Sequence, residues 1–309
     1  MTPLEWPAGS LAVVGTTAVG KSSLGLQLAE RLGAEIVSVD SMQVYRGMDI
    51  GTAKPTPAER AELAHHLIDL VDPAVDHTVA HFRDAAVEVA ADLHARGRPA
   101  VLVGGTGLYV RAIVEGLELA GRYPEIAAEF EAEADPTLLH QRLSALDPLA
   151  ASRIEPGNHR RLVRALEVTV GSGRPFSSYG AGMTEYPPSR VPLVGLRRPR
   201  PEINEAIERR LDRQLADGFV EEVAEVRRQG WGHTAAQALG YRELARHLDG
   251  HLSLQEARDT AVIAIRQFAR RQERWFRRDP RIEWIDATEP AKRIDTALAV
   301  AASWSGLTE

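Results

Sequence analysis

The chain has 309 residues, of which 44% are hydrophobic and 26% charged, and it carries a formal net charge of −6. This length predicts one large core with an insertion, or two domains, and the composition is ordinary for a globular protein. No run approaches the roughly 18 apolar residues of a membrane helix, the N-terminus has no secretory pattern, and the lack of cysteine excludes disulfides and thiolate metal sites. We therefore expect a cytoplasmic protein with no membrane partner. The net charge does not decide whether nucleic acid binds, because local patches govern that and residues 266–278 hold six arginines.

The first 114 residues alternate predicted strands and helices. Apolar runs at 11–14, 36–39 and 100–103 predict buried strands. Leucines four apart predict a helix over 23–32, closed by Gly33, and a second helix is expected over 79–96. This alternation predicts an α/β fold, a P-loop NTPase-like parallel sheet flanked by helices.

The pattern changes between residues 115 and 190. Helices are predicted at 126–134, 136–146 and 159–170 without a convincing strand, and a stretch rich in glycine and proline follows. A strand at 191–196, long helices and a short strand at 282–285 then resume the α/β pattern. We predict a catalytic core at 1–114 and 191–309 and a helical insertion domain at 115–190.

The first predicted strand leads into a loop that fits the phosphate-binding pattern G-x-x-x-x-G-K-[ST]. Backbone N–H groups, the helix N-terminus and the Lys21 ammonium would hold a di- or triphosphate, and the Ser22 hydroxyl is placed to ligate Mg²⁺. The residues predicted to bind phosphate are Gly15, Thr16, Thr17, Ala18, Val19, Gly20, Lys21 and Ser22. A chance match is the alternative, but the flanking strand and helix favour a phosphate site. The loop leaves open whether a γ-phosphate reacts or a diphosphate leaves.

Asp40 follows the second predicted strand, and ligands bind at the carboxyl ends of parallel strands. The segment 39–55 resembles the signature of bacterial tRNA dimethylallyltransferases, the IPP transferase family. Segments 98–109, 160–168, 218–223, 239–243 and 266–272 are similar to further motifs of that family, in the same order. With the P-loop, the resemblance extends from Gly15 to about Trp284.

The resemblance implies transfer of a dimethylallyl group from dimethylallyl diphosphate to N6 of an adenosine in tRNA. That adenosine lies immediately 3′ of the anticodon in tRNAs that read codons starting with U. Asp40 is similar to the family's catalytic base, which would assist a poorly nucleophilic amine, although a Walker-B-like Mg²⁺ ligand is the alternative. The resemblance also implies catalytic roles for Thr17 and Arg210, with Arg210 on the diphosphate, and Mg²⁺ as cofactor. Nothing in the sequence alone distinguishes Arg210 from a solvated charge beside Arg209 and Arg213.

The target base must leave its stack before Asp40 can reach its amine, so contacts to an anticodon stem-loop are expected. The resemblance implies tRNA contacts at Asp40, Ser41, Met42, Gln43, Thr106, Arg160, Arg161, Leu162, Val163, Arg164, Ala238, Leu239, Gly240, Tyr241, Arg242 and Glu243. Arginines at 160, 161 and 164 share one helix face. A second arginine stripe along 266–278 is either a solvated face or a further RNA contact. A monomer is expected.

The chain departs from the family pattern where Thr16 stands in place of the usual proline, which removes a φ restraint but no phosphate donor. The acidic stretch before Asp135 is also shorter than in the family, and the zinc finger of eukaryotic relatives is absent. An adenylate isopentenyltransferase acting on free nucleotide is the nearest rival interpretation. A small-molecule P-loop kinase and a non-catalytic RNA-binding module are the others.

Overall fold

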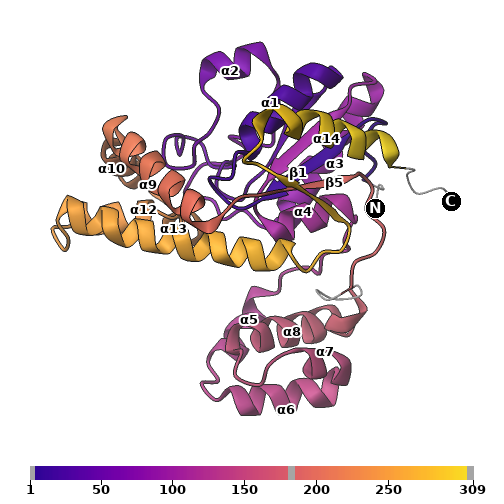
Figure 1. The fold of residues 1–309 in the computed structure, drawn as a ribbon. Coiled ribbons are helices and arrows are strands. Elements are labelled where there is room, and N and C mark those ends of the chain that lie inside the picture. Colours follow the sequence, from indigo (N-terminus) through magenta and orange to yellow (C-terminus); the bar gives the residue numbers. More distant parts are fainter. Residues whose placement is uncertain (1–3, 180–184, 305–309) are drawn as a thin grey trace. The chain divides into compact units, whose positions relative to one another are not determined.

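The computed structural model describes residues 4–179 and 185–304 (Figure 1). The chain divides into two compact units, Met1–Gly116 with Pro188–Glu309, and Leu117–Pro187. These boundaries lie within a few residues of those expected from the sequence. We refer to the first as the core unit and to the second as the insertion unit.

The core unit is built on a parallel sheet, six-stranded over the described residues, in the order β3-β2-β4-β1-β5-β6 (Figure 1). Its strands are β1 (Leu11–Gly15), β2 (Glu35–Val39), β3 (His65–His66), β4 (Ala100–Gly104), β5 (Leu193–Arg197) and β6 (Ile282–Asp286). All five strands predicted from apolar runs are present. The sixth, β3, has only two residues, too few to give a periodic signal.

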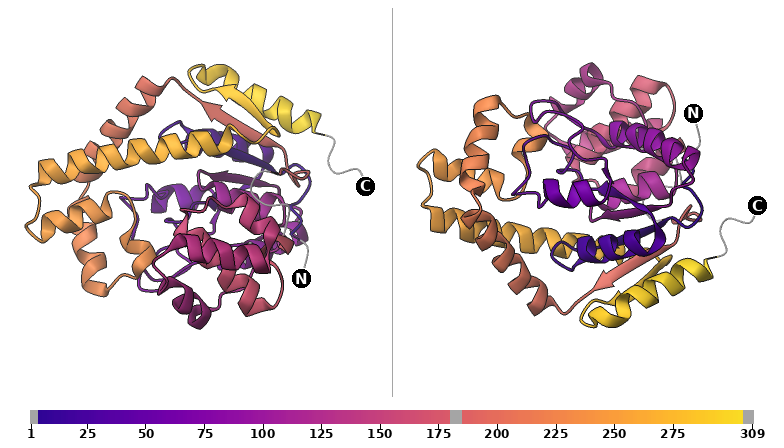
Figure 2. Two further views of the ribbon diagram at one scale, coloured as in Figure 1. Left: turned by 90° about the horizontal axis from the view of Figure 1, so that it is seen from below. Right: turned by 90° about the horizontal axis from the view of Figure 1, so that it is seen from above.

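Helices cover both faces of the sheet. The core-unit helices are α1 (Lys21–Leu32), α2 (Pro57–Glu62), α3 (Val79–Ala95), α4 (Gly107–Val114), α9 (Arg200–Ala216), α10 (Phe219–Gln229), α11 (His233–Ala236), α12 (Tyr241–Leu248), α13 (Leu254–Phe276) and α14 (Pro290–Ser303). Alternate residues of β1 point to opposite faces, as the pleat requires. Leu11 and Val13 pack in one cluster with Leu24 and Leu28 of α1, whereas Ala12 and Val14 belong to a second cluster that includes side chains of α3, α4 and α13. The C-terminal helix α14 lies beside α1, as the views of Figures 1 and 2 agree.

Glycine ends β1 and β4, at points where a side chain would meet the neighbouring strand. A side chain on Gly104 would collide with the carbonyl oxygen of Val39 in the neighbouring strand. A Cβ on Gly15 would lie 2.8 Å from the carbonyl oxygen of Leu196. Because β1, β2 and β4 are parallel, the loops that follow them lie at one edge of the sheet, where ligands bind in open parallel sheets.

The insertion unit is helical over its described residues, and the expectation that it lacks strands is confirmed there. It contains α5 (Pro124–Glu131), α6 (Pro136–Leu146), α7 (Pro148–Arg153), α8 (His159–Ser172) and the 3₁₀ helix η1 (Phe176–Ser178). It has its own apolar cluster, which includes Phe130, Leu143, Leu162 and Leu166. The sequence did not indicate α7, which is a short helix started by Pro148 and capped by the Asp147 carboxylate.

The chain leaves and rejoins the core unit at adjacent points. The backbone N–H of Arg190 donates to the carbonyl oxygen of Val114 at 2.8 Å. Beside this closure, the fully buried Glu115 carboxylate forms ion pairs with Arg111 and Arg281, each at 2.7 Å. Removing one partner of a buried ion pair typically costs about 3–5 kcal/mol, so the loss of Glu115, Arg111 or Arg281 should destabilise this part of the core unit.

Candidate active site

The P-loop forms one wall of a cavity of about 690 Å³ in the core unit. The loop backbone takes left-handed φ angles at Ala18 (+61°) and Gly20 (+105°), and α1 begins at Lys21. Five of the eight residues predicted to bind phosphate line the cavity: Thr17, Ala18, Gly20, Lys21 and Ser22. Gly15, Thr16 and Val19 do not. Val19 is buried among the residues between the sheet and α1, and the buried hydroxyl of Thr16 has no hydrogen-bond partner within the described chain.

Lys21 is the cation at the centre of this loop. Its ammonium donates to the carbonyl oxygen of Thr16 at 2.7 Å. Burial lowers the pKa of Lys21 from 10.5 to about 8, the charge of Asp40 acts in the opposite direction, and the charge of Arg210 lowers the pKa further. An anion bound nearby would stabilise the charged form of this buried ammonium and raise its pKa again.

Arg210 is the one arginine of its helix that reaches the P-loop. Its Nη2 donates to Thr17 Oγ1 at 2.8 Å, and burial lowers its pKa. The side chain of Arg209 is instead 66% exposed and pairs with Glu205 on the same helix. Arg213 lines the cavity, but its Nε donates to the carbonyl oxygen of Arg209. The geometry therefore distinguishes Arg210 from its neighbours, which the sequence pattern alone does not.

Asp40 lies directly after β2 and lines the same cavity. Its Oδ1 accepts from the backbone N–H of Met42 at 2.8 Å and of Gln43 at 3.4 Å, while Oδ2 accepts no hydrogen bond from the described residues. Thr106 Oγ1, at the start of α4, accepts from the backbone N–H of Ser41 at 3.2 Å. One carboxylate oxygen thus stays available to a substrate beside the P-loop.

The segments predicted to contact the base enclose the cavity beyond Asp40. Met42 and Gln43 line it, and Gln43 is held by the Ser38 hydroxyl and by the carbonyl oxygens of Thr52 and Ala53. In the predicted segment Ala238, Leu239, Gly240, Tyr241, Arg242 and Glu243, only Ala238, Leu239 and Tyr241 are among the lining residues. Glu243 is buried and accepts from the backbone N–H of Gly240, so its carboxylate caps α12 rather than facing the cavity.

The predicted tRNA contacts at 160–164 belong to the insertion unit. Arg160 and Arg161 are exposed on α8, whereas Leu162 and Val163 are buried in the core of that unit. Arg164 is turned inward, where it donates to the carbonyl oxygens of Ala120 and Gly121 and pairs with Glu167 at 2.8 Å.

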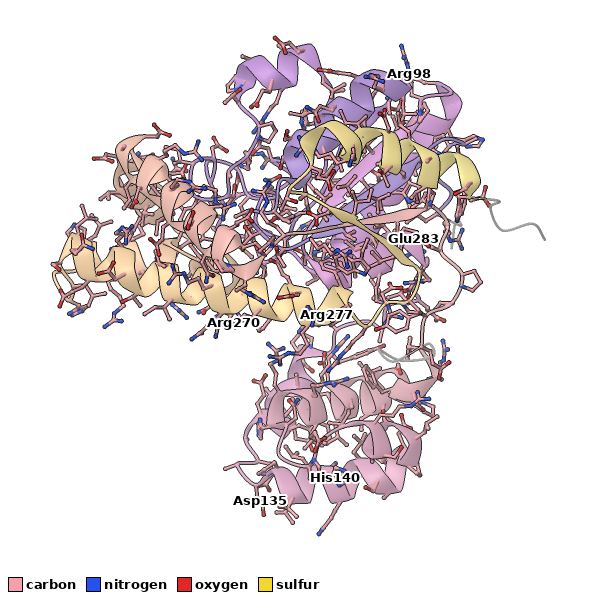
Figure 3. The ribbon with its side chains drawn as sticks, viewed as in Figure 1. Arg98, Asp135, His140, Arg270, Arg277 and Glu283 are labelled. Atoms are coloured by element: carbon pink, nitrogen blue, oxygen red, sulfur yellow. The ribbon has the colours of Figure 1, made fainter. Side chains whose placement is uncertain are left out.

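The second arginine stripe, along 266–278, lies on the C-terminal part of α13 and on the two residues that follow it. Arg266 forms an ion pair with Glu208, and Arg277 pairs with Glu273 at 2.5 Å. Arg270 is exposed and has no ion-pair partner among the described residues (Figure 3). Acidic partners therefore neutralise part of the stripe.

Sequence reasoning gave no role to two side chains that shape this site. The Glu222 carboxylate accepts from the backbone N–H groups of Asp49, Ile50 and Gly51 at 2.7–3.0 Å and from the hydroxyl of Tyr241. Gln272 accepts from the backbone N–H of Thr17. Both lie within motifs 218–223 and 266–272, but their backbone partners are more than 160 residues away along the chain, and no local pattern signals such contacts.

The residues near Ser22 include no preformed metal cage. Within the described residues, no group of three or more His, Cys, Asp or Glu side chains could hold a metal ion. Mg²⁺ keeps several waters and is commonly bound by one or two protein groups together with substrate phosphates. A hydroxyl at Ser22 beside a phosphate cradle fits that mode of binding.

The strand order and the loop after β1 define a P-loop protein. The lysine and arginine that reach its cavity have the charge that suits a phosphorylated ligand. The chain belongs to the IPP transferase family, whose model matches residues 43–279. It is 49% identical over 307 residues to a tRNA dimethylallyltransferase of a Nocardioides species, covering 98% of each chain. It is 48% identical to the tRNA dimethylallyltransferase of Thermobifida fusca, covering 96% of this chain and 95% of the relative.

Among solved structures, the chain resembles the full-length tRNA isopentenylpyrophosphate transferase from Bacillus halodurans. The TM-score is 0.70 at 38% identity, covering 94% of this chain and 95% of the other. None of the helices in ranges 4–179 and 185–304 is long and apolar enough to cross a membrane.

Proposed function

We propose that this protein is a tRNA dimethylallyltransferase, which moves a dimethylallyl group from dimethylallyl diphosphate to N6 of an adenosine in tRNA. The observation that carries the proposal is the convergence of Lys21, Arg210 and Asp40 on one cavity at the P-loop. Two cations and a cradle of amides suit a leaving diphosphate, and the carboxylate suits an amine that must lose a proton. Family membership and relatives at 48–49% identity support the same reaction.

The donor half of the site would bind the diphosphate. The loop amides and Lys21 would hold its oxygens. Arg210, from α9, is held against the loop by its hydrogen bond to the Thr17 hydroxyl. When the C1–O bond breaks, the electron pair of that bond goes to the diphosphate. Fixed donors that meet this developing charge commonly account for the largest single part of the rate enhancement.

The acceptor half would bind the flipped adenine. The N6 lone pair forms the new bond to C1, and the N6 proton passes to the carboxylate of Asp40. Positioned general bases contribute about 10²–10⁴-fold. Asp40 is suited to this role because its Oδ1 is held by backbone N–H groups while Oδ2 accepts no bond from the described chain.

We also propose Mg²⁺ as cofactor, with the Ser22 hydroxyl as the protein ligand among diphosphate oxygens and water. The ion would neutralise charge on the leaving group. Every other contribution comes from the backbone amides and side chains described above.

The acceptor we propose is the adenosine immediately 3′ of the anticodon in tRNAs that read codons starting with U. Arg160 and Arg161, exposed on α8, would bind phosphates of the anticodon stem-loop. Loop bases would be held by the cavity residues Ser41, Met42, Gln43, Ala238, Leu239 and Tyr241. A free nucleotide needs no insertion unit, which counts against an adenylate isopentenyltransferase. We propose a cytoplasmic monomer.

The test incubates purified protein and Mg²⁺ with labelled dimethylallyl diphosphate and either unmodified tRNA or AMP. We expect label on tRNA only, lost when the adenosine 3′ of the anticodon is replaced. Asp40→Asn should reduce turnover by about 10²–10⁴-fold with tRNA affinity retained. Label on AMP alone would refute the tRNA acceptor, and a fully active Asp40→Asn would refute the base.

A further inference from the structure

Gln272 joins three segments of the active site that are far apart in the sequence. It lies on α13 with only 7% of its surface exposed. Its Oε1 accepts from the backbone N–H of Thr17 at 2.8 Å, and its Nε2 donates to the carbonyl oxygen of Gly105 at 2.8 Å. These partners are 255 and 167 residues away along the chain.

Each of the two bonds holds a segment that carries a different half of the proposed chemistry. Thr17 accepts from Arg210, on the diphosphate side. Gly105 immediately precedes Thr106, whose hydroxyl accepts from the backbone of Ser41 beside Asp40. The Gln272 amide is therefore a direct link between the donor half and the acceptor half.

The Gln272 amide packs closely against Gly105, with no room for a side chain at that position. A Cβ on Gly105 would collide with Nε2 of Gln272 and would lie 3.3 Å from the carbonyl oxygen of Gly15 and 3.4 Å from Nζ of Lys21. Only a glycine allows the Gln272 amide to approach the end of β4 this closely. The Gln272 side chain therefore bonds to both the P-loop and the loop after β4 at a point where these loops also lie directly against each other.

The bond to Thr17 also fixes the shape of the P-loop. Ala18 has a φ of +61°, which is unusual for a residue with a side chain and must be held by its surroundings. The N–H of the preceding residue is bonded to Gln272, so it is not directed at phosphate. Gln272 thus shapes the loop without being part of the cradle.

We propose that Gln272 is a positioning residue that sets the distance between the diphosphate side and the base side of the site. This inference rests on the proposed prenyl transfer. Replacing Gln272 leaves the groups that bind diphosphate in place but removes their alignment with Asp40. The inference therefore predicts a lower kcat with a nearly unchanged KM for dimethylallyl diphosphate. Misplacement of reacting groups by about 1 Å can cost about 10²-fold in rate.

The first variant is Gln272→Met, which keeps the length of the side chain and removes both hydrogen bonds. We expect kcat to fall by about 10–100-fold while KM for dimethylallyl diphosphate changes by less than about 3-fold. The matched control is Val262→Ala, which weakens the buried face of the same helix away from the cavity. It should lower the Tm and leave kcat unchanged.

A second variant, Gln272→Glu, keeps the proposal testable if Gln272→Met does not fold. A protonated carboxyl can accept from Thr17 and donate to Gly105 as the amide does, whereas the carboxylate cannot donate. The ratio of variant to wild-type kcat should therefore rise as the pH falls.

Three outcomes would overturn the inference: unchanged kcat in Gln272→Met, a rise in KM for dimethylallyl diphosphate with kcat retained, or an equal loss of kcat in Val262→Ala. A pH-independent ratio for Gln272→Glu would overturn it as well. Wild-type protein assayed alongside keeps the two proposals distinct. Wild-type activity with normal kcat in Gln272→Met refutes only the role of Gln272, and a wild type unable to prenylate tRNA refutes the proposed function.

Discussion

The bond between Arg210 and Thr17 makes a prediction that a double-mutant cycle can test. Arg210 comes from α9 and Thr17 from the P-loop, and their only direct link is the 2.8 Å bond from Nη2 to Oγ1. We expect Thr17 to act chiefly by holding Arg210 against the diphosphate. The two substitutions Arg210→Ala and Thr17→Val should then be strongly non-additive.

The magnitudes follow from the kind of contact each residue makes. Removing one donor aimed at a developing negative charge costs about 10²–10³-fold in kcat, which we expect for Arg210→Ala. A hydrogen bond to a charged group contributes about 1.5–3 kcal/mol, so Thr17→Val should cost about 10–100-fold. The double variant should resemble Arg210→Ala alone, because Thr17 has nothing left to position.

The assay is single-turnover transfer of labelled dimethylallyl to unmodified tRNA at saturating concentrations of both substrates. Arg209→Ala is the matched control, since Arg209 is exposed on the same helix and pairs only with Glu205. It should retain kcat. If the double variant loses the product of the two single effects, about 10³–10⁵-fold, Thr17 and Arg210 act independently and the reasoning fails.

Three further predictions follow from the site and the insertion unit. Because burial lowers the pKa of Lys21 to about 8 and a bound anion favours the charged form, the Kd for dimethylallyl diphosphate should be lowest below pH 8 and rise up to about tenfold per pH unit above it. Calorimetry from pH 7 to 9.5 checks this, and a pH-independent Kd would contradict it. Thr16→Val removes a buried hydroxyl that has no hydrogen-bond partner in the described chain, so it should raise the free energy of unfolding by about 1 kcal/mol. It should not change kcat, because Lys21 donates to the backbone carbonyl of Thr16, which the substitution keeps. A lower Tm would show that this hydroxyl is satisfied. Replacing Arg160 and Arg161 by alanine should raise KM for tRNA and flatten its salt dependence while leaving the Kd for dimethylallyl diphosphate unchanged; an unaltered KM for tRNA would contradict their role.

Much of the fold could be predicted because most strands and α1 show local hydrophobic patterns in the sequence. The strands at 11–15, 35–39, 100–104, 193–197 and 282–286 are short apolar runs, and α1 has leucines at a spacing of four. The elements that were missed are short or lack a clear period. β3 has two residues, and α4 begins with glycine and is buried on most of its faces, so neither shows the periodicity from which a helix or strand is predicted.

Individual residues of the candidate site could be predicted from the sequence, whereas the hydrogen bonds between its distant segments could not. Lys21 and Asp40 follow from a loop pattern and from the end of a strand. Arg210 required the family resemblance, and only the structure distinguishes it from Arg209 through its bond to Thr17. Gln272 has no local signal, because its partners are brought to it by the tertiary fold.

The closure of the chain at Val114 and Arg190 has an evolutionary consequence. Because the two ends of the insertion are joined by a backbone hydrogen bond within the core unit, the length between them can grow or shrink without altering the sheet. A tight turn in its place would leave the P-loop, Asp40 and Arg210 connected as they are. The insertion unit can therefore differ in length or sequence while the sheet and the cavity at the P-loop keep their structure.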